Sequence, residues 1–268
     1  MPTITALNIY PVKSCKGVAL KEARIGATGL EHDREWLIVR PDGRFITQRE
    51  EPRLALIEPS LDATHLRLEA PGMQPLEVPA NLQSNPVEVT CWRDRCSAFD
   101  AGVEAERWLE RYLGSPHRLV RFDPAHRRVA SMDWTRGVEA LNQFSDGFPF
   151  LVISQASLDD LNSRLASPVP MDRFRPNFVV EGSEAFAEDG WKKIAIGETV
   201  FHVVKPCARC VIPTIDQTTG VSTGKEPTKT LATYRNFGGK VHFGQNLIAE
   251  KAGGRIKPGD EVKILETN

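Results

Sequence analysis

Short runs of β-prone residues dominate the first ~100 positions of the chain. These runs occupy residues 7–10, 36–39, 54–58, 66–70 and 87–89. Turn signals such as Pro41-Asp42-Gly43 separate them. Regularly spaced short strands and turns are typical of an antiparallel sheet or barrel. We therefore expect residues 1–122 to form a β-barrel-like domain.

One segment departs from this pattern because its apolar residues have a helical period. Between residues 101 and 114, apolar side chains recur at positions 105, 108, 109, 112 and 113. Gly114 is a residue type that commonly ends helices, so we predict that the helix ends there. Residues 118–122 return to a strand pattern. The polar stretch 123–145 predicts a long loop, and such loops are often functional in compact domains.

The rest of the chain is again rich in expected strands, with two further helices. Strands are expected at residues 150–153, 178–180, 193–196, 200–204, 211–215, 247–249 and 256–264. We expect one helix from Ser157, acting as N-cap, to about residue 165, and another from Thr228 to Tyr234. Segments 225–227 and 243–246 are expected as polar turns. The fold class is mixed, β-rich α+β, and residues 123–268 form a second β-barrel domain with peripheral helices.

Composition narrows the possible partners. The formal net charge of the 268 residues is −1, so no global field favours a nucleic acid or an anionic membrane. There is no apolar run of about 18 residues and no signal peptide at the N-terminus. An odd number of cysteines, five, predicts reduced thiols in a cytoplasmic protein.

Cys207 and Cys210 form a Cys-x-x-Cys pair, which leaves several chemistries open. A thioredoxin-type redox pair sits at the start of a helix, and the strand expected at 211–215 disfavours it. A structural zinc site needs four ligands, which Cys91 and Cys96 would have to complete.

Two alternatives remain for the same pair. The first is a single reactive thiolate, which the neighbouring cations Lys205 and Arg209 would favour. The second is a pair of inert buried thiols. Of all these alternatives, the single reactive thiolate has the best support.

Basic residues in the N-terminal part predict an anion site. Lys13, Ser14 and Lys16 follow the first strand at a turn, where backbone donors, a hydroxyl and ammonium groups can hold a phosphate. The glycine pattern of a P-loop is absent. Arg34 stands at the start of a strand, next to Asp33, with which it could instead form a surface ion pair.

A second set of planar donors flanks Pro176. Proline stiffens this turn, and Phe174 and Phe178 are expected to bury its two sides. Arg175 and Asn177 would then be held before a strand as rigid donors. Such donors suit the recognition of a phosphate or a planar heterocycle.

These segments, in this order, resemble the MOSC-domain family, named for the C-terminal domain of molybdenum cofactor sulfurases. The pattern is closest to the mitochondrial amidoxime reducing components and their bacterial counterparts. The motifs that carry the resemblance are Tyr10-Pro11-Val12-Lys13-Ser14, the Arg34 strand entry, Thr47-Gln48-Arg49-Glu50-Glu51-Pro52-Arg53-Leu54, Phe174-Arg175-Pro176-Asn177, Cys207-Ala208-Arg209-Cys210 and Lys225-Glu226-Pro227. Residues 1–122 correspond to the MOSC N-terminal β-barrel domain and residues 123–268 to the MOSC domain.

The resemblance implies a molybdenum–pyranopterin cofactor and assigns its contacts. Cys210 matches the cysteine that ligates molybdenum in this family and is the expected catalytic residue. The expected cofactor-binding residues are Lys13, Ser14, Arg34 and Arg175 at the phosphate, Asn177 at the pterin, and in addition Asp146 and Arg209. Asp146 is the only residue of the segment 146–149 that carries over from the mitochondrial members.

The implied activity is the reduction of N-hydroxylated compounds such as hydroxylamines, amidoximes and N-oxides. The C-terminal ferredoxin domain of some bacterial relatives has no counterpart here. We therefore expect electrons from a separate protein of ferredoxin, flavoprotein or cytochrome type, and no membrane anchor. The alternatives are a sulfur carrier or cofactor-maturation module using a cysteine persulfide, and a non-catalytic module that stores or delivers the cofactor.

Overall fold

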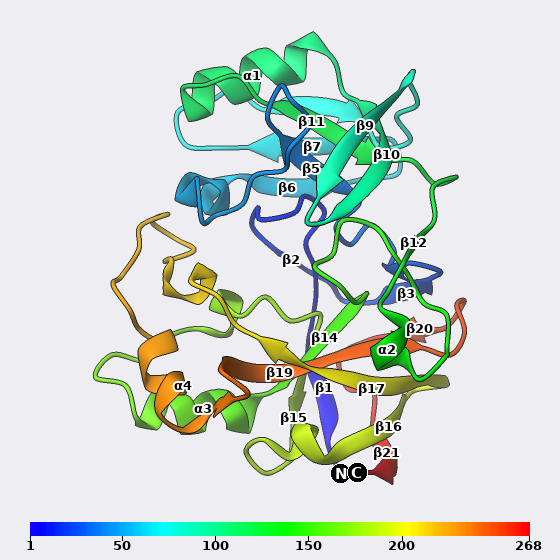
Figure 1. The fold of residues 1–268 in the computed structure, drawn as a ribbon, viewed down its shortest axis with the longest axis vertical. Coiled ribbons are helices and arrows are strands. Elements are labelled where there is room, and N and C mark those ends of the chain that lie inside the picture. The colour runs from blue at the N-terminus through cyan, green and yellow to red at the C-terminus, as the bar shows by residue number, and fades with distance from the viewer.

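The computed structural model describes residues 1–268 and consists of two lobes (Figure 1). The upper lobe in this view carries helix α1 (Val103–Leu113) and the strands from β5 to β11. The lower lobe contains the largest sheet, and both chain termini lie at its far end. The N-terminal strand β1 (Thr3–Ile9) belongs to the lower lobe, because it pairs with β15 (Phe178–Glu181). The chain thus starts in one lobe, builds the other and then returns.

The lower lobe is built on a nine-stranded sheet. Its strands, in spatial order, are β2 (Val18–Ala19), β1, β15, β14 (Phe150–Ser154), β19 (Lys240–Ala249), β17 (Thr199–Ala208), β16 (Trp191–Ile196) and β21 (Val262–Thr267), with β18 (Asn236–Phe237) beside β19. β14 and β15 run parallel, whereas the other neighbours are antiparallel. The parallel pair is connected through α3 (Gln155–Ser163), as a parallel crossover requires.

The two sides of this sheet curl back toward each other. Thr3 on β1 forms an isolated bridge with Glu261, which precedes β21. The backbone N–H of Val262 also donates to the carbonyl of Pro2 at 2.8 Å. This curvature gives the lobe its barrel-like shape and confirms the β-rich α+β fold class expected from the sequence.

Aromatic side chains fill the interior of the curled sheet. Phe150 lies 5.7 Å from Phe178 and 5.3 Å from Phe201, measured between ring centroids. Burying each such ring contributes roughly 1.5–3 kcal/mol. Phe150 also lines the pocket described below, so the apolar core supports the floor of that pocket.

The upper lobe contains two smaller sheets. One consists of β5 (Trp36–Val39), β11 (Arg118–Phe122), β10 (Asp94–Asp100) and β9 (Pro86–Cys91), and the other of β6 (Glu58–Leu61), β7 (His65–Glu69) and β8 (Leu76–Pro79). Helix α1 buries Trp108 and Leu109, and Gly114 follows it in the left-handed conformation, with φ 79°. The helix and its glycine cap agree with the prediction from periodicity.

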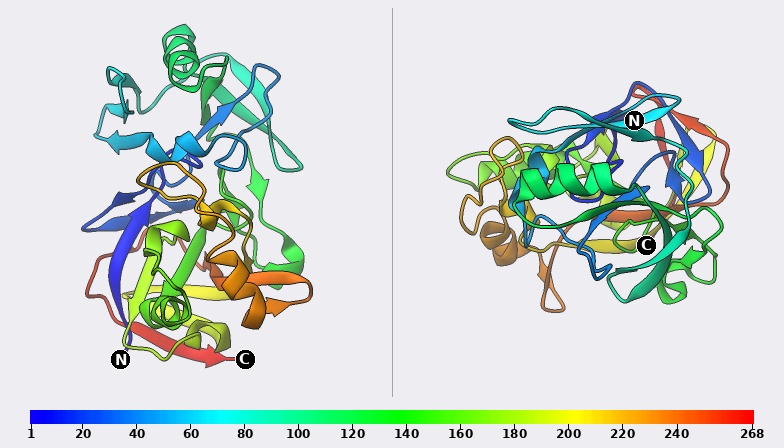
Figure 2. Two further views of the ribbon diagram at one scale, coloured as in Figure 1. Left: turned by 90° about the vertical axis from the view of Figure 1, so that its left-hand side faces the viewer. Right: turned by 90° about the horizontal axis from the view of Figure 1, so that it is seen from above.

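Short elements complete the fold. They are β3 (Ala23–Gly26), β4 (Gly29–Leu30), β20 (Arg255–Ile256), β12 (Arg128–Val129), β13 (Leu141–Asn142), α2 (Met132–Thr135) and α4 (Thr228–Tyr234). Figure 2 shows the two lobes stacked along the long axis of the molecule. Helix α4 has the predicted bounds. No helix is both long and apolar enough to cross a membrane.

The predicted start of α3 was wrong by one turn. Ser154 is the N-cap, because its hydroxyl accepts a hydrogen bond from the backbone N–H of Ser157. The Ser157 hydroxyl instead donates to the buried carboxylate of Glu188 at 2.9 Å. A tertiary contact with a residue 31 positions away decided which serine caps the helix.

Two expected strands are 3-10 helices. Residues 54–58 were predicted as a strand, but η1 (Pro52–Leu56) covers most of them, and β6 starts only at Glu58. Residues 211–215 were predicted as a strand, but they contain η4 (Ile212–Thr214). A proline near the start of each segment lacks the N–H that a strand ladder needs. A single short 3-10 turn is not the long helix of a thioredoxin motif.

Two expected loops are more ordered than predicted. Segment 243–246 is not a turn but lies inside β19, where Gly244 adopts a φ of 79°. Segment 123–145 contains β12, α2 and β13, and the buried guanidinium of Arg128 holds its end. Arg128 donates to the carbonyls of Gln143 and Ser145, at 2.7 Å each.

Candidate active site

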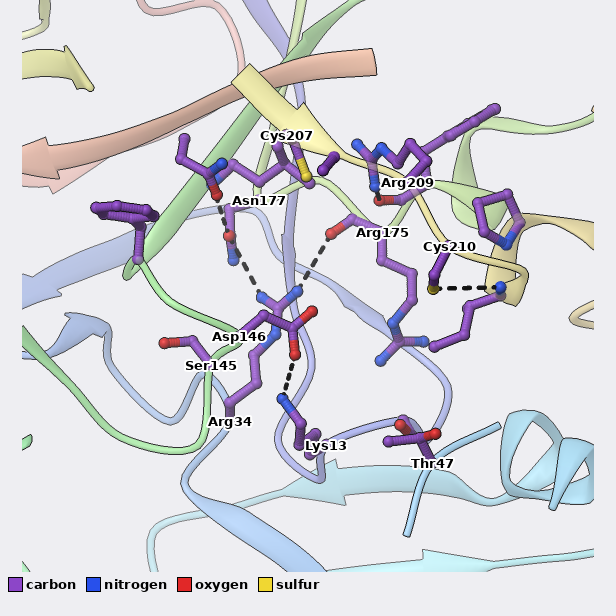
Figure 3. A pocket seen from close by; sticks show the side chains of 18 of the residues that line it. Lys13, Arg34, Thr47, Ser145, Asp146, Arg175, Asn177, Cys207, Arg209 and Cys210 are labelled. Atoms are coloured by element: carbon purple, nitrogen blue, oxygen red, sulfur yellow. Dashed lines mark hydrogen bonds and ion pairs between the residues drawn. The ribbon is translucent and has the colours of Figure 1, made fainter. Parts of the chain in front are cut away.

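The main pocket is lined by residues from both lobes, and every residue predicted to bind the cofactor or the metal lines it (Figure 3). Lys16, which was also expected at the anion site, is outside the pocket and is paired with Glu58. The pocket has an empty volume of about 850 Å³, counted together with its open mouth. The sequence-predicted residues among its lining are Lys13, Ser14, Arg34, Asp146, Arg175, Asn177, Arg209 and Cys210. Tertiary structure thus brings together residues that are up to about two hundred positions apart.

The pocket is strongly cationic. Its single acidic side chain is Asp146, and its basic side chains are Lys13, Arg34, Arg49, Arg173, Arg175 and Arg209. Such an excess of positive charge attracts an anion. Which of these cations is available to an anion depends on the partners that each already has within the protein.

Four of the residues around the pocket have backbones in the left-handed region. Ser14, Arg34, Trp92 and Arg175 have φ values of 67°, 51°, 61° and 57°. Non-glycine residues rarely adopt this conformation, and strained residues of this kind gather at functional sites. Ser14 sits in the tight turn after β1, and its side chain borders the same pocket.

Arg34 is neutralised by its neighbour Asp33. Its Nη1 lies 2.7 Å and 2.6 Å from the two carboxylate oxygens of Asp33, which is almost fully buried. Its Nη2 donates to the backbone carbonyl of Arg175 at 3.2 Å (Figure 3). The sequence raised an ion pair with Asp33 as the alternative role of Arg34. The pair is present, but it is buried at the pocket and not on the surface.

Arg175, in contrast, has no carboxylate partner and donates no side-chain hydrogen bond within the protein. The ring of Tyr10 lies 4.2 Å from its Cζ atom. Burial lowers the pKa of Arg175, and the positive charge of Arg34 acts in the same direction. Arg175 is partly buried. A partly buried cation without a counter-charge is unfavourable, so this guanidinium favours a bound anion.

Lys13 and Asp146 form the ion pair that joins the two lobes at the pocket. Lys13 Nζ lies 2.5 Å from Asp146 Oδ1 and donates to the Phe144 carbonyl at 2.7 Å. The Asp146 side chain is 76% exposed. Desolvation by the pocket around it would raise its pKa, but the charge of Lys13, the hydrogen bond from Lys13 and the charge of Arg34 outweigh this and hold that pKa well below its usual range. Asp146 is therefore a permanent anion, and Lys13 is already paired.

Asn177 is buried and serves as a connector within the protein. Its Oδ1 accepts from the N–H of Leu151 at 3.1 Å and from Arg34 at 3.3 Å. Its Nδ2 donates to the carbonyl of Asn8 at 3.1 Å. These bonds tie β1, β14 and the Arg175 turn together, so Asn177 fixes the wall of the pocket.

Cys210 lies in the bend between β17 and η4, and its Sγ accepts the N–H of Ile212 at 3.5 Å. Cys207 lies at an irregularity of β17, where the register with β19 shifts. Both thiols are free and partly exposed. Burial raises the pKa of Cys207, which favours its thiol form.

Arg209 positions this cysteine segment. Its guanidinium donates to the carbonyl of Phe243 at 2.9 Å and 2.6 Å and to the carbonyl of Phe174 at 2.8 Å. Arg209 therefore fastens the end of β17 to β19 and to the Arg175 turn. Its donors face backbone carbonyls, so its place among the cofactor-binding residues stays a prediction.

The structure does not form the four-cysteine zinc site considered from the sequence. Cys91 and Cys96 are buried in the β9–β10 hairpin, packed in the core of the upper lobe. No group of three or more His, Cys, Asp or Glu side chains is arranged to hold a metal. The protein by itself therefore offers no complete set of ligands for a metal in this pocket.

Several residues that line the pocket were not predicted as site residues. They are Thr47, Arg49, Trp92, Arg173 and Asn246, among others. Thr47 and Arg49 belong to a motif noted for the resemblance, so the sequence did contain a signal for them. Trp92 lies at the tip of the β9–β10 hairpin, and nothing in its local pattern indicates a pocket.

The fold and the site define a β-rich two-lobed protein with a cationic pocket and two free thiols, Cys207 and Cys210, in its wall. The first 116 residues match the family model for the MOSC N-terminal beta barrel domain, and residues 140–263 match the MOSC domain. The chain belongs to the MOSC-domain family.

Relatives within this family are named as amidoxime-reducing components. The human mitochondrial amidoxime-reducing component 1 is 38% identical over 98% of this chain and 83% of its own length. The rat mitochondrial amidoxime reducing component 2 is 38% identical over 97% of this chain and 82% of its own length. Among solved structures, the YUAD protein from Bacillus subtilis is 12% identical, covers 98% of this chain and 94% of its own, and has a TM-score of 0.46.

Proposed function

We propose that this protein is a molybdenum-cofactor-dependent reductase of N-hydroxylated compounds. The observation that carries the proposal is the meeting of Cys210 and Arg175 in one pocket. Cys210 offers a soft ligand, and Arg175 offers an uncompensated cation. The names of the relatives, amidoxime-reducing components, supply the substrate class.

The donor set of the pocket fits a molybdenum–pyranopterin cofactor. Thiolate is a ligand type that suits soft metal centres and binds in its deprotonated form. Arg175 and the turn at Ser14 offer a cation and a hydroxyl for the phosphate of the cofactor. Because no protein cluster can complete a metal site, a metal here requires a cofactor that brings its own ligands.

Each protein group then has a distinct task. Cys210 would ligate the metal, while Arg209 fastens the segment that carries it. Lys13 and Arg34, both paired with carboxylates, would shape the phosphate site and add to its positive potential. Asn177 would hold the wall against which the pterin lies.

The bound cofactor would supply two-electron chemistry at the N–O bond. In the overall reaction, an N–OH compound takes up two electrons and two protons and gives the reduced nitrogen compound and water. The electrons would come from a separate donor protein of ferredoxin, flavoprotein or cytochrome type. The place of action is proposed as the cytoplasm, although the similar relatives are named mitochondrial.

Metal and pterin analysis of three purified proteins tests the proposal. Wild type should contain molybdenum and pterin in equal amounts, and Cys210→Ser should lose the molybdenum. Cys207→Ser is the matched control, because it removes a thiol three residues away and should retain the metal. A folded wild-type protein without molybdenum, or equal metal content in all three, would contradict the proposal. A labile extra sulfur on a cysteine would instead favour the sulfur-carrier alternative.

A further inference from the structure

Two of the six cations around the pocket have neither a carboxylate partner nor a side-chain hydrogen bond within the protein. Lys13 is paired with Asp146 and Arg34 with Asp33. Arg173 is paired with Asp216 at 2.7 Å, and Arg209 donates to carbonyls. The two that remain are Arg49 and Arg175, which have neither an ion pair nor a side-chain hydrogen bond within the protein.

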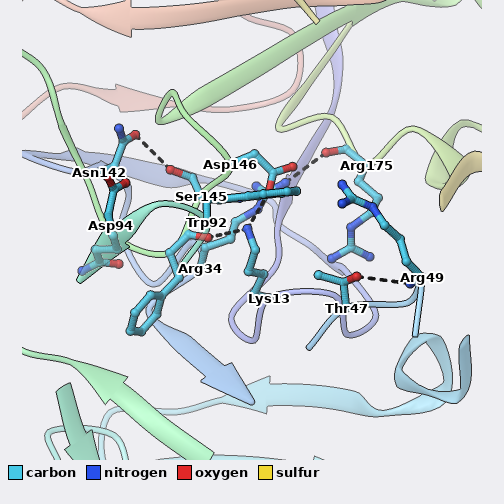
Figure 4. A network of polar contacts seen from close by, with 12 residues as sticks. Lys13, Arg34, Thr47, Arg49, Trp92, Asp94, Asn142, Ser145, Asp146 and Arg175 are labelled. Atoms are coloured by element: carbon cyan, nitrogen blue, oxygen red, sulfur yellow. Dashed lines mark hydrogen bonds and ion pairs between the residues drawn. The ribbon is translucent and has the colours of Figure 1, made fainter. Parts of the chain in front are cut away.

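Each of these two arginines is instead placed against an aromatic ring. Arg175 Cζ lies 4.2 Å from the ring centroid of Tyr10, and Arg49 Cζ lies 4.7 Å from that of Trp92. A cation–π contact holds a guanidinium in place without cancelling its charge or occupying its N–H donors. Both arginines therefore remain able to bind an anion. Figure 4 shows them on the same side of the pocket.

Trp92, which contacts Arg49, is itself held in place by several contacts. Its Nε1–H donates to Asp146 at 3.2 Å, across the boundary between the lobes. Its ring packs against Phe45 at 5.1 Å, and the Lys13 ammonium lies 5.8 Å from its centroid. Its backbone φ is 61°, a conformation that is unfavourable for a bulky residue. Strain of this kind persists where the surrounding contacts enforce it.

We infer that Arg49 is a second anion-binding residue of the pocket and that Trp92 is its positioning residue. The ligand is a phosphate monoester, which in the proposed function is that of the cofactor. Such a group carries a charge of about −1.5 to −2 at neutral pH. Arg49 and Arg175 supply two positive charges whose N–H donors are not occupied within the protein, and these two charges match that of the ligand.

Binding of inorganic phosphate to the full-length protein prepared without cofactor tests this inference. Titration calorimetry compares wild type with Arg49→Ala, Trp92→Leu and the double variant. Leucine keeps an apolar side chain at the hairpin tip but removes the aromatic face and the N–H donor. We expect Arg49→Ala to weaken phosphate binding about tenfold, and Trp92→Leu to weaken it by several-fold.

The double variant separates positioning from general damage to the fold. If Trp92 acts through Arg49, Trp92→Leu has little further effect once Arg49 is alanine. Trp92→Phe, which keeps an aromatic face, should restore most of the binding. Trp134→Leu is the matched control: the Lys205 ammonium lies 4.4 Å from the Trp134 ring, but neither residue lines this pocket. It should bind phosphate like wild type.

Two results would overturn the inference. One is wild-type phosphate affinity in Arg49→Ala. The other is an equal loss from Trp92→Leu with and without Arg49, because a merely structural tryptophan would give additive effects. The test needs no metal, so it is independent of the proposed function. Suppose that wild type lacks molybdenum but the variants show the expected changes in phosphate affinity. The cofactor proposal would then be wrong, and the inference of an anion site at Arg49 would stand.

Discussion

The side-chain amides of Gln48 and Gln217 bind each other reciprocally. Each Nε2 donates to the Oε1 of the other at 2.9 Å, and both residues are buried. Gln48 also donates to the carbonyl of Ser14 at 2.7 Å. The pair thus connects the turn that carries Ser14 to the segment that follows Cys210. It is a direct link between the anion-binding and thiol-bearing parts of the pocket.

Breaking this amide pair should destabilise the protein and loosen the pocket. Gln48→Leu leaves a buried amide of Gln217 without its partner, which costs about 1–3 kcal/mol. The double variant Gln48→Leu/Gln217→Leu should cost less than the sum of the two single changes, because neither amide is then left without its amide partner. Urea denaturation of the four proteins measures this, and strictly additive losses would show that the two amides do not act as a pair.

Gly244 should tolerate no side chain. Its φ is 79°, and a Cβ atom there would lie 2.6 Å from Ile153 Cγ1 and 2.8 Å from the carbonyl oxygen of Val152. We expect Gly244→Ala to lower the free energy of unfolding by about 2–4 kcal/mol, from steric overlap and left-handed strain together. Retention of bound cofactor should also fall, because the adjacent Phe243 carbonyl anchors Arg209.

Gly72 provides a control for that substitution. Its φ is 74°, but no atom lies within 4 Å of the position that a Cβ would take. Gly72→Ala therefore tests left-handed strain alone and should cost about 1–2 kcal/mol. Thermal or urea unfolding measures both variants. An equal loss of unfolding free energy in the two would mean that the close contact at Gly244 is unimportant.

The contribution of Glu188 to the free energy of unfolding should decrease as the pH rises through the mildly acidic range. Burial raises the pKa of this carboxyl, although hydrogen bonds from Ser154 and Ser157 act in the opposite direction. Its protonated form is thus favoured in the folded state. The stabilisation is fully present below the ordinary glutamate pKa of about 4.3 and is lost as the pH rises through the higher folded value.

Glu188→Gln should remove this part of the pH dependence. The amide cannot ionise, so between about pH 4 and pH 7 the free energy of unfolding of wild type should fall relative to that of the variant. Urea denaturation at several pH values measures both curves. A decline of equal size in the variant would assign the pH dependence to other groups.

The cysteines should differ in their reaction with iodoacetamide. Burial raises the pKa of Cys15 and of Cys96 to about 12, so both remain protonated at pH 8. Cys210 is accessible in the pocket, whereas burial also raises the pKa of Cys207. Peptide mapping by mass spectrometry should therefore find Cys210 alkylated first in cofactor-free protein. Faster alkylation of Cys207 would contradict the prediction that Cys210 is the more reactive of the two thiols.

Bound cofactor should protect the same thiol. In the molybdenum-loaded protein, ligation would occupy Cys210, and its alkylation should slow by more than tenfold relative to the cofactor-free form. Cys207 serves as the internal reference. Unchanged labelling of Cys210 in protein with full molybdenum content would exclude it as the ligand.

Local patterns predicted those elements that depend on neighbouring residues alone. The spacing of apolar residues and Gly114 identified α1, and the bounds of α4 were right. The prediction failed where tertiary contacts decide. Ser154 caps α3 because Ser157 is engaged by Glu188. Gly244 looks like part of a turn but lies inside a strand, because its missing side chain allows β14 to approach closely.

The sequence by itself determined the chemical groups of the site. Cys210, Arg175 and Lys13 were recognisable from their residue types and motifs, and all of them line the pocket. Only the tertiary structure decided which cations are available to a ligand. Arg34 is neutralised by Asp33, while Arg49 is held on Trp92 and keeps its charge. The physical reason is that charge compensation depends on distances of a few ångströms between side chains from separate loops and strands, which spacing along the chain does not encode.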